Sequence, residues 1–414
     1  MAVNPGYKRT EVGVIPEDWK LVLLGDVIKV YRGGSPRPIQ DYLTTSVDGV
    51  NWIKIGDVGV GEKYIDSTEE RIKPDGIRYS REIKEGDFLL SNSMSFGRPY
   101  ISRVSGCIHD GWLVLQNYDS TFGQEFLYYL LSSKLILDQY LHRASGSSVL
   151  NLNKKLVASV FLIVPSKAEQ SAISEALSDV DAALGALDRL IAKKRDMKHS
   201  AMQELLTGKK RLPGYSSEWV SCILSDIGDF SKGKGITKDD LVPDGVPCVR
   251  YGEIYTHHND TVREFRSFIS QETASKSQRI QKGDLLFTGS GETSEEIGKC
   301  VAFLGEEEAY AGGDIVIFSP RGQNSMYLGY LMNHSSVANQ KARFGQGDAV
   351  VHISARNLGQ LELCLPSINE QTTIAQALSD MDDEIAALEK QRDKTWALKQ
   401  GMMQELLTGK MRLI

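Results

Sequence analysis

The sequence predicts an α/β (α+β) fold, with two similar mixed α/β domains separated by two long helices that form an antiparallel coiled coil. Three observations predict it. An internal repeat divides the 414 residues into two copies. Each copy ends in a segment whose apolar residues recur at gaps of four and three. Strand-like segments and glycine-rich turns fill the rest of each copy.

The repeat is strongest where each copy ends. Met202–Lys209 and Met403–Lys410 share the octamer Met-Gln-Glu-Leu-Leu-Thr-Gly-Lys without a mismatch, at an offset of 403 minus 202, or 201 residues. At the same offset Glu169-Gln170 meets Glu370-Gln371. The upstream parts match more weakly and with small insertions. The chain therefore reads as a first variable domain (1–165), a first helical segment (166–212), a second variable domain (213–365) and a second helical segment (366–414).

Each helical segment carries the signals of a long helix. Ser166-x-x-Glu169 and Ser367-x-x-Glu370 are capping boxes at the start, and Gly208 and Gly409 supply the C-terminal glycine. About 40 residues at 1.5 Å each span ~60 Å, longer than one domain needs. The predicted seam of the first helix is Ile173, Leu177, Val180, Leu184, Leu187, Ile191, Lys194, Lys198, Ala201 and Leu205. That of the second is Ile374, Leu378, Met381, Ile385, Leu388, Arg392, Thr395, Lys399, Met402 and Leu406. The alternative is two amphipathic helices that each pack on their own domain.

Connectivity predicts the direction of the pair. The second domain begins soon after the first helix ends, so a second helix that pairs with the first must run back along it. Pro5-Gly-Tyr7 repeats Pro213-Gly-Tyr215, the segment that follows the first helix. We therefore predict a closed, ring-like arrangement with pseudo-twofold symmetry, cut just before residue 5.

The variable domains read as mixed α and β. The expected strands of the first are 53–55, 87–91, 112–115 and 160–164, with a helix over 126–141. The second repeats this with strands at 248–251, 284–288, 314–318 and 361–365.

Motifs for catalysis are missing. Gly228–Lys234 has the glycine spacing of a phosphate-binding loop, but Gly235 stands where Ser or Thr should bind magnesium. No Pro-Pro dipeptide supports an amine methyltransferase tetrad, and His257-His258 is an isolated doublet in a polar stretch. We expect no catalytic residue, no metal site and no cofactor in this chain.

The five cysteines are odd in number and too widely spaced for a disulfide framework or a zinc site. No apolar run approaches the ~20 residues that cross a bilayer. The N-terminal residues lack the apolar core of a secretory signal. These observations predict a cytoplasmic protein without a membrane contact.

The paired Glu-Gln openings, the paired Leu-Leu-Thr-Gly closings and the domain motifs together resemble one known family over essentially the whole chain. The domain motifs are Arg32-Gly-Gly-Ser-Pro36, Trp52–Asp57, Glu85–Leu90 and Gly146-Ser147. The chain resembles the DNA-specificity (S) subunit of type I restriction–modification systems. The second copy departs from the pattern with Lys232-Gly-Lys-Gly235 and Gly347-Asp348.

The resemblance implies a non-catalytic subunit that recognises double-stranded DNA. Each variable domain would be a target-recognition domain that reads one half of a bipartite, asymmetric site. The helices would set the spacing and dock two modification subunits, which use S-adenosylmethionine to methylate adenine. Restriction subunits, which use ATP and magnesium, would join for cleavage.

Candidate DNA contacts are basic or polar residues of the motif loops, since Arg reads guanine and Gln reads adenine. In the first domain they are Arg32, Arg37, Lys54, Ser93, Arg98, His109 and Ser147. In the second they are Lys232, Lys234, Arg250, Ser290, Lys299, Arg343 and Gln346. Residues 213–365 carry 14 basic and 20 acidic side chains, so binding there must rest on local patches. Two alternatives remain open: a coiled-coil scaffold that binds protein only, and a self-contained nuclease or methyltransferase.

Overall fold

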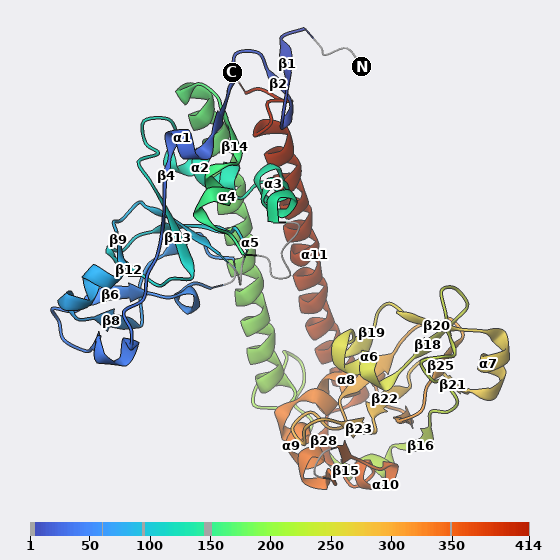
Figure 1. Ribbon diagram of the computed structural model, residues 1–414. Helices are drawn as coiled ribbons and strands as arrows, with labels where there is room; N and C mark the ends of the chain where they lie inside the picture. The colour runs from blue at the N-terminus through green and yellow to red at the C-terminus, as the bar shows by residue number, and fades with distance from the viewer. Residues whose placement is uncertain (1–4, 60, 93–95, 145–150, 348–349, 414) are drawn as a thin grey trace. The chain divides into compact units, whose positions relative to one another are not determined.

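The computed structural model describes residues 5–59, 61–92, 96–144, 151–347 and 350–413 (Figure 1). The chain divides into two compact units. The first contains Met1–Asp188 and Gln391–Ile414, and the second contains Arg189–Lys390. Two 39-residue helices, α5 (Lys167–Leu205) and α11 (Ile368–Leu406), each contribute one part to each unit. Every unit therefore joins one domain to parts of both helices.

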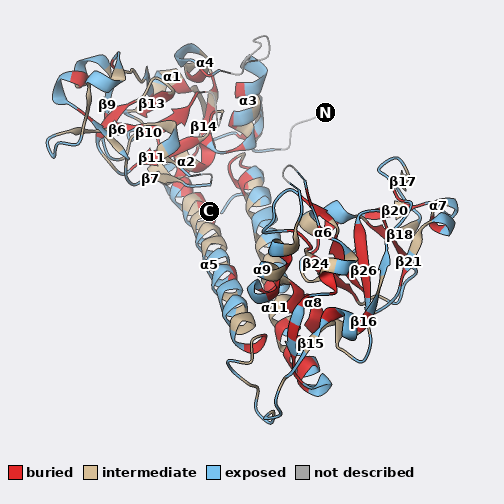
Figure 2. Cartoon of the chain, turned by 90° about the horizontal axis from the view of Figure 1, so that it is seen from below, coloured by how far each residue is buried: buried red, intermediate tan, exposed pale blue. Residues whose placement is uncertain are grey.

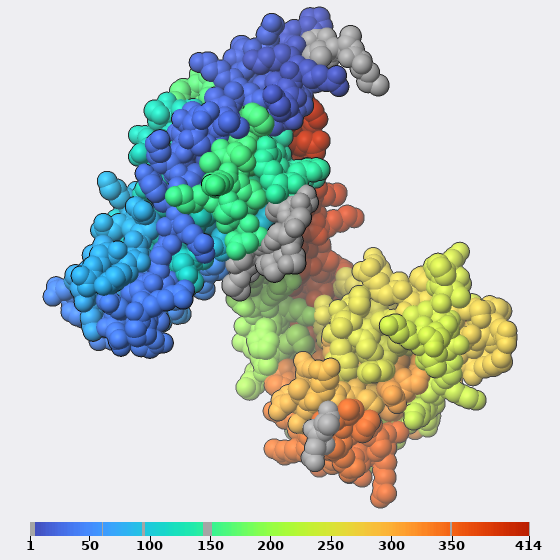
Figure 3. Space-filling model, in the orientation of Figure 1, coloured from blue at the N-terminus to red at the C-terminus, as the bar shows by residue number. Residues whose placement is uncertain are grey.

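Two five-stranded sheets form the body of the first domain. One has the order β4-β13-β10-β11-β7, with bounds Lys29–Arg32, Trp112–Gln116, Phe88–Ser91, Pro99–Ser102 and Tyr64–Ile65. The other has the order β5-β8-β6-β12-β9, with bounds Leu43–Thr44, Glu70–Ile72, Val50–Ile53, Gly106–Ile108 and Arg81–Ile83. Within this unit the second sheet stands away from the helices, in the blue lobe of Figure 3.

The second domain repeats both sheets strand for strand. The first of them has the order β16-β26-β22-β24-β19, with bounds Gly228–Lys232, Ile315–Pro320, Leu285–Thr288, Cys300–Phe303 and Thr261–Val262. The other has the order β17-β20-β18-β25-β21, with bounds Leu241–Val242, Ser267–Ile269, Val246–Val249, Ala309–Ala311 and Gln278–Ile280. The registers agree too, since Phe88 faces Leu115 in one domain and Leu285 faces Phe318 in the other. The predicted pair of similar mixed α/β domains is confirmed.

Shorter elements connect each domain to its helices. In the first unit they are β1 (Tyr7–Thr10), β2 (Gly13–Pro16), β3 (Lys20–Leu23), α1 (Leu24–Val27), α2 (Gln124–Leu131), α3 (Lys134–Ala144), α4 (Lys154–Ala158) and β14 (Phe161–Val164). In the second they are β15 (Val220–Ile223), α6 (Tyr251–Thr256), α7 (Gln271–Lys276), β23 (Ser290–Gly291), α8 (Ser325–Asn333), α9 (Ser335–Phe344), β27 (Val351–His352), α10 (Ala355–Leu358) and β28 (Glu362–Leu365). Helices α2 and α8 occupy the same place in the two units. Each lies between the long helices and one sheet, which contains β11 in the first unit and β24 in the second.

Three predicted elements were wrong in detail. The strand expected at 248–251 ends at Val249, and Tyr251 begins α6. The helix expected over 126–141 is two helices, α2 and α3, because Ser132 and Ser133 between them donate their hydroxyls to the carbonyls of Tyr128 and Leu130. The strand expected at 53–55 ends at Ile53. The amide of Lys54 instead donates to the carboxylate of Asp57 at 2.7 Å, which starts a short 3₁₀ turn.

Each hydrophobic core runs from a domain onto both long helices. The core of the first unit includes Ile173 and Leu177 of α5 and also Met403 and Leu406 of α11. The core of the second unit includes Leu205 of α5 and, from α11, Ile374 and Leu378. Burying such a side chain contributes roughly 1.5–3 kcal/mol. The helices are therefore part of both folding units and do not merely connect them.

The helices run antiparallel within each unit, as predicted. Every residue of the two predicted seams is buried or half-buried, and the outer faces are exposed (Figure 2). The polar seam positions face carboxylates of the opposite helix. Lys399 pairs with Asp181 at 2.6 Å in the first unit, and Lys194 pairs with Glu384 at 2.6 Å in the second. These ion pairs explain why the seam tolerates lysine, since a buried cation requires a partner.

The capping signals also hold. In the first box Ser166 and Glu169 exchange both bonds, at 3.2 Å each. In the second, the amide of Glu370 donates to the Ser367 hydroxyl at 3.4 Å. Gly208 and Gly409 both have φ +70°, the left-handed conformation that ends a helix.

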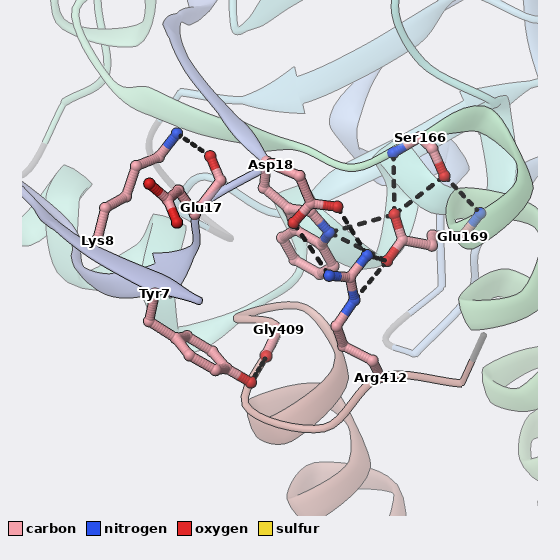
Figure 4. A network of polar contacts seen from close by, with 9 residues as sticks. Tyr7, Lys8, Glu17, Asp18, Ser166, Glu169, Gly409 and Arg412 are labelled. Atoms are coloured by element: carbon pink, nitrogen blue, oxygen red, sulfur yellow. Dashed lines mark hydrogen bonds and ion pairs between the residues drawn. The ribbon is translucent and has the colours of Figure 1, made fainter. Parts of the chain in front are cut away.

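The two ends of the chain meet within the first unit (Figure 4). The Tyr7 hydroxyl donates to the carbonyl of Gly409 at 3.1 Å. Arg412 binds Asp18 and Glu169, as Arg211, 201 residues earlier, binds Glu370 in the second unit. The last residues thus do for the first domain what the segment after α5 does for the second. This supports the predicted cyclic order of the chain.

Candidate nucleic-acid interface

Three of the predicted DNA contacts of the first domain lie at strand ends, and a fourth, Arg37, lies in the loop that follows β4. Arg32 ends β4, Lys54 follows β6 and His109 follows β12. Strands β6 and β12 are parallel, with Ile53 beside Ile108, so the residues that follow them emerge at one edge. We call Arg32, Arg37, Lys54 and His109 the first basic cluster.

One carboxylate organises the first basic cluster. Asp110 accepts from Arg37 at 3.3 Å, and its other oxygen lies 3.0 Å from Nε2 of His109. The hydroxyl of Ser35 donates to the same carboxylate at 3.1 Å. Arg32 donates to the backbone carbonyl of Asp110 at 3.2 Å. Burial alone would raise the pKa of Asp110, but the charge of His109 and the bonds from Ser35 and Arg37 outweigh it and lower the pKa.

The cluster borders an open hollow of about 440 Å³, which is lined by Arg37, Lys54, His109 and Asp110 together with Trp52. The side chain of Arg37 is 81% exposed, so its guanidinium can leave Asp110 without disturbing the core. Lys54 is held at 3.0 Å by Glu70, which raises the pKa of the ammonium through their hydrogen bond. The cluster therefore offers cations that are positioned and still reachable from solvent.

The glycine motif beside Arg32 serves packing. A Cβ atom on Gly33 would lie 2.1 Å from the carbonyl oxygen of His109. A Cβ atom on the equivalent Gly233 would lie 2.0 Å from the carbonyl oxygen of Gly312. Only glycine allows this approach. The glycines thus allow the end of β4 or β16 to pack against the turn after β12 or β25. This packing accounts for the glycines without a bound phosphate.

Arg98 does not join the cluster. Arg98 lies beside the ring of Tyr100, with 5.7 Å from its guanidinium carbon to the ring centroid. Ser93 and Ser147 lie outside the described residues.

In the second domain three of the seven candidates meet. Lys232, Ser290 and Gln346 line an open hollow of about 520 Å³ with His352. The hydroxyl of Ser290 lies 2.9 Å from Nδ1 of His352, on paired strands β23 and β27. We call these four residues the second polar cluster. Its hydroxyl, amide and imidazole groups can exchange hydrogen bonds with base edges, while Lys232 supplies charge.

The remaining candidates of the second domain stand apart. Lys234 and Arg343 are exposed and do not line this hollow. Arg250, the counterpart of Lys54, is bonded to the buried Glu253 at 3.1 Å, but its side chain is still 32% exposed. Lys299 donates to the carbonyl of His258 at 2.9 Å, and burial lowers the pKa of its ammonium. Lys299 is thus committed to the fold.

Superposing the strand registers shows why the two clusters differ. Leu113 and Val316 pair with Arg32 and Lys232, so the residues ahead of those strands correspond as well. His109-Asp110 of the first domain then stands where Gly312-Gly313 stands in the second. The two domains therefore present different chemistry from one scaffold.

Sequence reasoning missed Asp110 and His352. Asp110 stands two residues before the predicted strand at 112–115, but an acidic side chain is not an expected contact for phosphate. His352 lies next to no predicted strand, so no sequence signal marked it. No group of three or more His, Cys, Asp or Glu that could hold a metal ion occurs among the residues that the structure describes. Likewise, no described helix is long and apolar enough to cross a membrane.

The family model of the type I restriction modification DNA specificity domain matches residues 16–193 and again residues 216–395. The chain belongs to this family. Each copy of the repeat is thus one DNA specificity domain together with most of the helix that follows it.

Relatives and solved structures agree with this membership. The chain is 23% identical to the type I restriction enzyme MjaVIII specificity subunit of Methanocaldococcus jannaschii, over 96% of this chain and 94% of that protein. It is 25% identical to the putative MjaX specificity subunit of the same organism, over 98% and 97%. A chain from a structure on complex assembly and conformational transition of the type I R-M system has a TM-score of 0.63 at 17% identity, over 96% and 99%. The type I S subunit from M. genitalium has a TM-score of 0.57 at 14% identity, over 98% of both chains. The structures show that the fold is shared.

Proposed function

We propose that the chain is the sequence-specific DNA-recognition subunit of a type I restriction–modification complex. Segments 1–165 and 213–365 are the target-recognition domains, and each reads one half of a bipartite, asymmetric site. The single observation that carries the proposal is the pair of specificity domains with one backbone and two different polar clusters. Two diverged readers on one duplex read two different half-sites.

The partners follow from the family and from the helices. We propose that α5 and α11 dock two modification subunits, because these helices share identical blocks, such as Met202–Lys209 and Met403–Lys410, while the domains diverge more. S-adenosylmethionine would be bound by those partners, and ATP and magnesium by restriction subunits. Partner subunits would also supply phosphate contacts, since the second domain is acidic overall. We further propose a cytoplasmic location, which fits five unpaired cysteines.

Nothing favours the two alternatives. A scaffold that binds protein only would not need a different polar cluster on each of two domains with the same backbone. A self-contained nuclease or methyltransferase would need a catalytic constellation, and the family is one of specificity domains.

Mapping of methylated adenines in cells that carry the chain with its modification subunits tests the proposal. We expect one asymmetric motif in two parts with a fixed gap. The purified chain alone, incubated with DNA and labelled S-adenosylmethionine or with magnesium, should neither methylate nor cut. A continuous or palindromic motif would contradict two separate readers, and turnover by the chain alone would contradict the non-catalytic role.

A further inference from the structure

A three-residue joint ties each recognition domain to both long helices. In the first unit the buried Tyr129 of α2 donates its hydroxyl to Asp181 of α5 at 2.8 Å. Lys399 of α11 binds the other oxygen of Asp181 at 2.6 Å. The ammonium of Lys399 also lies over the ring of Tyr129, 5.5 Å from its centroid. We call these residues the first joint.

The second unit contains the same joint at the same offset of 201 residues. Tyr330 of α8 donates to Asp382 of α11 at 2.6 Å. Lys198 of α5 binds the other oxygen of Asp382 at 2.8 Å and lies 5.0 Å from the centroid of the Tyr330 ring. Tyr330, Asp382 and Lys198 are the second joint. Each joint takes its tyrosine from the domain, its aspartate from one helix and its lysine from the other.

In each joint an ion pair and a hydrogen bond are largely shielded from solvent. The lysine side chains are only 17% and 13% exposed, and both tyrosines are buried. Burial, followed by the bond to the aspartate, raises the pKa of each tyrosine, so both stay neutral donors. A hydrogen bond to a carboxylate is about twice as strong as a neutral one. Because the lysine comes from the opposite helix, the joint forms only in one register of the pair.

A second contact joins α2 and α8 to the long helices at another point. The side-chain oxygen of Gln170 accepts from the amide of Gly123, just before α2, at 2.8 Å. Gln371 accepts from Asn324 before α8 at 3.0 Å. Each glutamine binds the start of α2 or α8 to a single long helix. The tyrosine of the joint binds a later turn of α2 or α8 to both long helices. Two separated points fix the direction of α2 or α8.

We propose that the joints are positioning devices that fix how each recognition domain stands on the helices of its unit, and so fix the gap accepted between the half-sites. This inference rests on the proposed function. Consecutive base pairs differ by ~34° of twist and ~3.4 Å of rise. A domain that can turn by a comparable angle accepts a gap that is one base pair too long or too short, whereas a fixed domain rejects it.

The test uses the full chain in complex with its modification subunits. Lys399→Met removes the cation of the first joint and keeps the length of the side chain, and Lys399→Arg retains the cation. We expect Lys399→Met to raise methylation at sites with a gap one base pair longer or shorter by ~5–10-fold relative to sites with the native gap. Both half-site sequences should stay unchanged, and Lys399→Arg should keep the native gap preference.

Two further variants complete the design. Tyr129→Phe, which loses only a hydroxyl, tests the same joint if Lys399→Met does not fold. Lys134→Ala is the matched control, because it breaks an exposed ion pair to Asp138 within α3 that touches neither long helix. The control should leave the gap preference unchanged.

The outcomes separate the two proposals. A wild-type complex with no bipartite site would overturn the proposed function and this role of the joints with it. A wild-type complex with a bipartite site, together with folded joint variants that keep the native gap preference, would overturn the joint proposal alone. If Lys134→Ala relaxed the gap preference as much as the joint variants do, the joint proposal would also be overturned, because any loss of stability would then have the same effect.

Discussion

At the scale of single residues, Asp110 decides the state of the first basic cluster. It holds the side chains of Arg37 and His109 while no DNA is present. A carboxylate in this place weakens contacts with phosphate and leaves room for a contact with a base that donates a hydrogen bond, such as cytosine. We therefore propose that Asp110 lowers the general affinity for DNA and raises the selectivity at the first half-site.

Replacing this carboxylate should reverse that balance. We expect Asp110→Asn to tighten binding to unrelated DNA by ~3–10-fold and to steepen the salt dependence by about one phosphate contact. Discrimination at the first half-site should fall. Fluorescence anisotropy of the assembled complex at several salt concentrations measures both effects. Asp138→Asn, which removes an equal charge on α3, is the control, and an identical effect of both variants would count against a special role of Asp110.

Lys341 of α9 is an unusual buried residue. Its side chain is 2% exposed, and its ammonium donates to the carbonyl of Gly298. Burial lowers its pKa from 10.5 to about 8. In the unfolded chain the pKa keeps its ordinary value, so between pH 8 and pH 10.5 the unfolded state binds more protons and the stability rises with pH. Below pH 8 the cost of burying the charge is fully present.

Lys341→Met should therefore stabilise the second unit at pH 7 by about 1–3 kcal/mol, because it removes a buried charge and keeps the volume. The variant should also lose the rise in stability between pH 8 and pH 10. Thermal unfolding at pH 7 and pH 9.5 measures both, with the exposed Lys276→Met as the control. A variant that is less stable than the wild type at both pH values would show that the bond to Gly298 outweighs the burial of charge.

At the scale of elements, the antiparallel pair has a register that the sequence did not provide. The seam positions follow from periodicity, since apolar side chains must face the partner. Periodicity does not predict which residues of the two helices lie at the same level, because that depends on how the two helices are paired. The ion pair between Asp188 and Arg392 places these two residues at the same level of the pair.

We therefore expect that a heptad inserted after Asp188, with a second after Gln391, keeps the seam in phase. It adds ~10 Å of helix, or up to ~3 base pairs of gap. Three extra base pairs also rotate the second half-site, and bending or untwisting costs a few kcal/mol. Methylation should weaken and the preferred gap should lengthen by about one to three base pairs, with both half-sites unchanged. An unaltered gap at full activity, in maps of methylated adenines, would show that the helices do not set the gap.

The strands were predictable where burial on both faces leaves a short apolar run, as at Phe88–Ser91 and Trp112–Gln116. The clusters were predictable only in part. Arg32, Lys54 and His109 stand near strand ends in the sequence, but their meeting depends on the parallel pairing of β6 with β12. The joints were missed for another reason. Tyr129 and Tyr330 lie at the repeat offset, but a tyrosine in an amphipathic helix is expected to pack in the hydrophobic core.

At the scale of the whole molecule, the chain has a cyclic order. The contacts of Tyr7 with Gly409 and of Arg412 with Asp18 bring its ends together in the first unit. A permuted chain that starts near Ser216, with residue 414 joined to residue 5, should therefore fold and support methylation of the same motif. Methylation assays of this permutant with the modification subunits test this. A permutant that folds but never assembles would refute the cyclic order.

The central claim is that each domain reads its own half-site, and Lys54→Ala and Arg250→Ala test it most directly. The two residues are structural counterparts, since each follows the equivalent strand, β6 or β18, and begins a helical turn. Loss of a base contact costs ~1–3 kcal/mol and relaxes one position, whereas loss of a phosphate contact weakens all sequences alike. The measurement is a map of methylated adenines in cells that carry each variant. We predict that Lys54→Ala changes methylation only through one half-site and Arg250→Ala only through the other. Equal changes in both half-sites, or changes by both variants in the same half-site, would contradict separate readers.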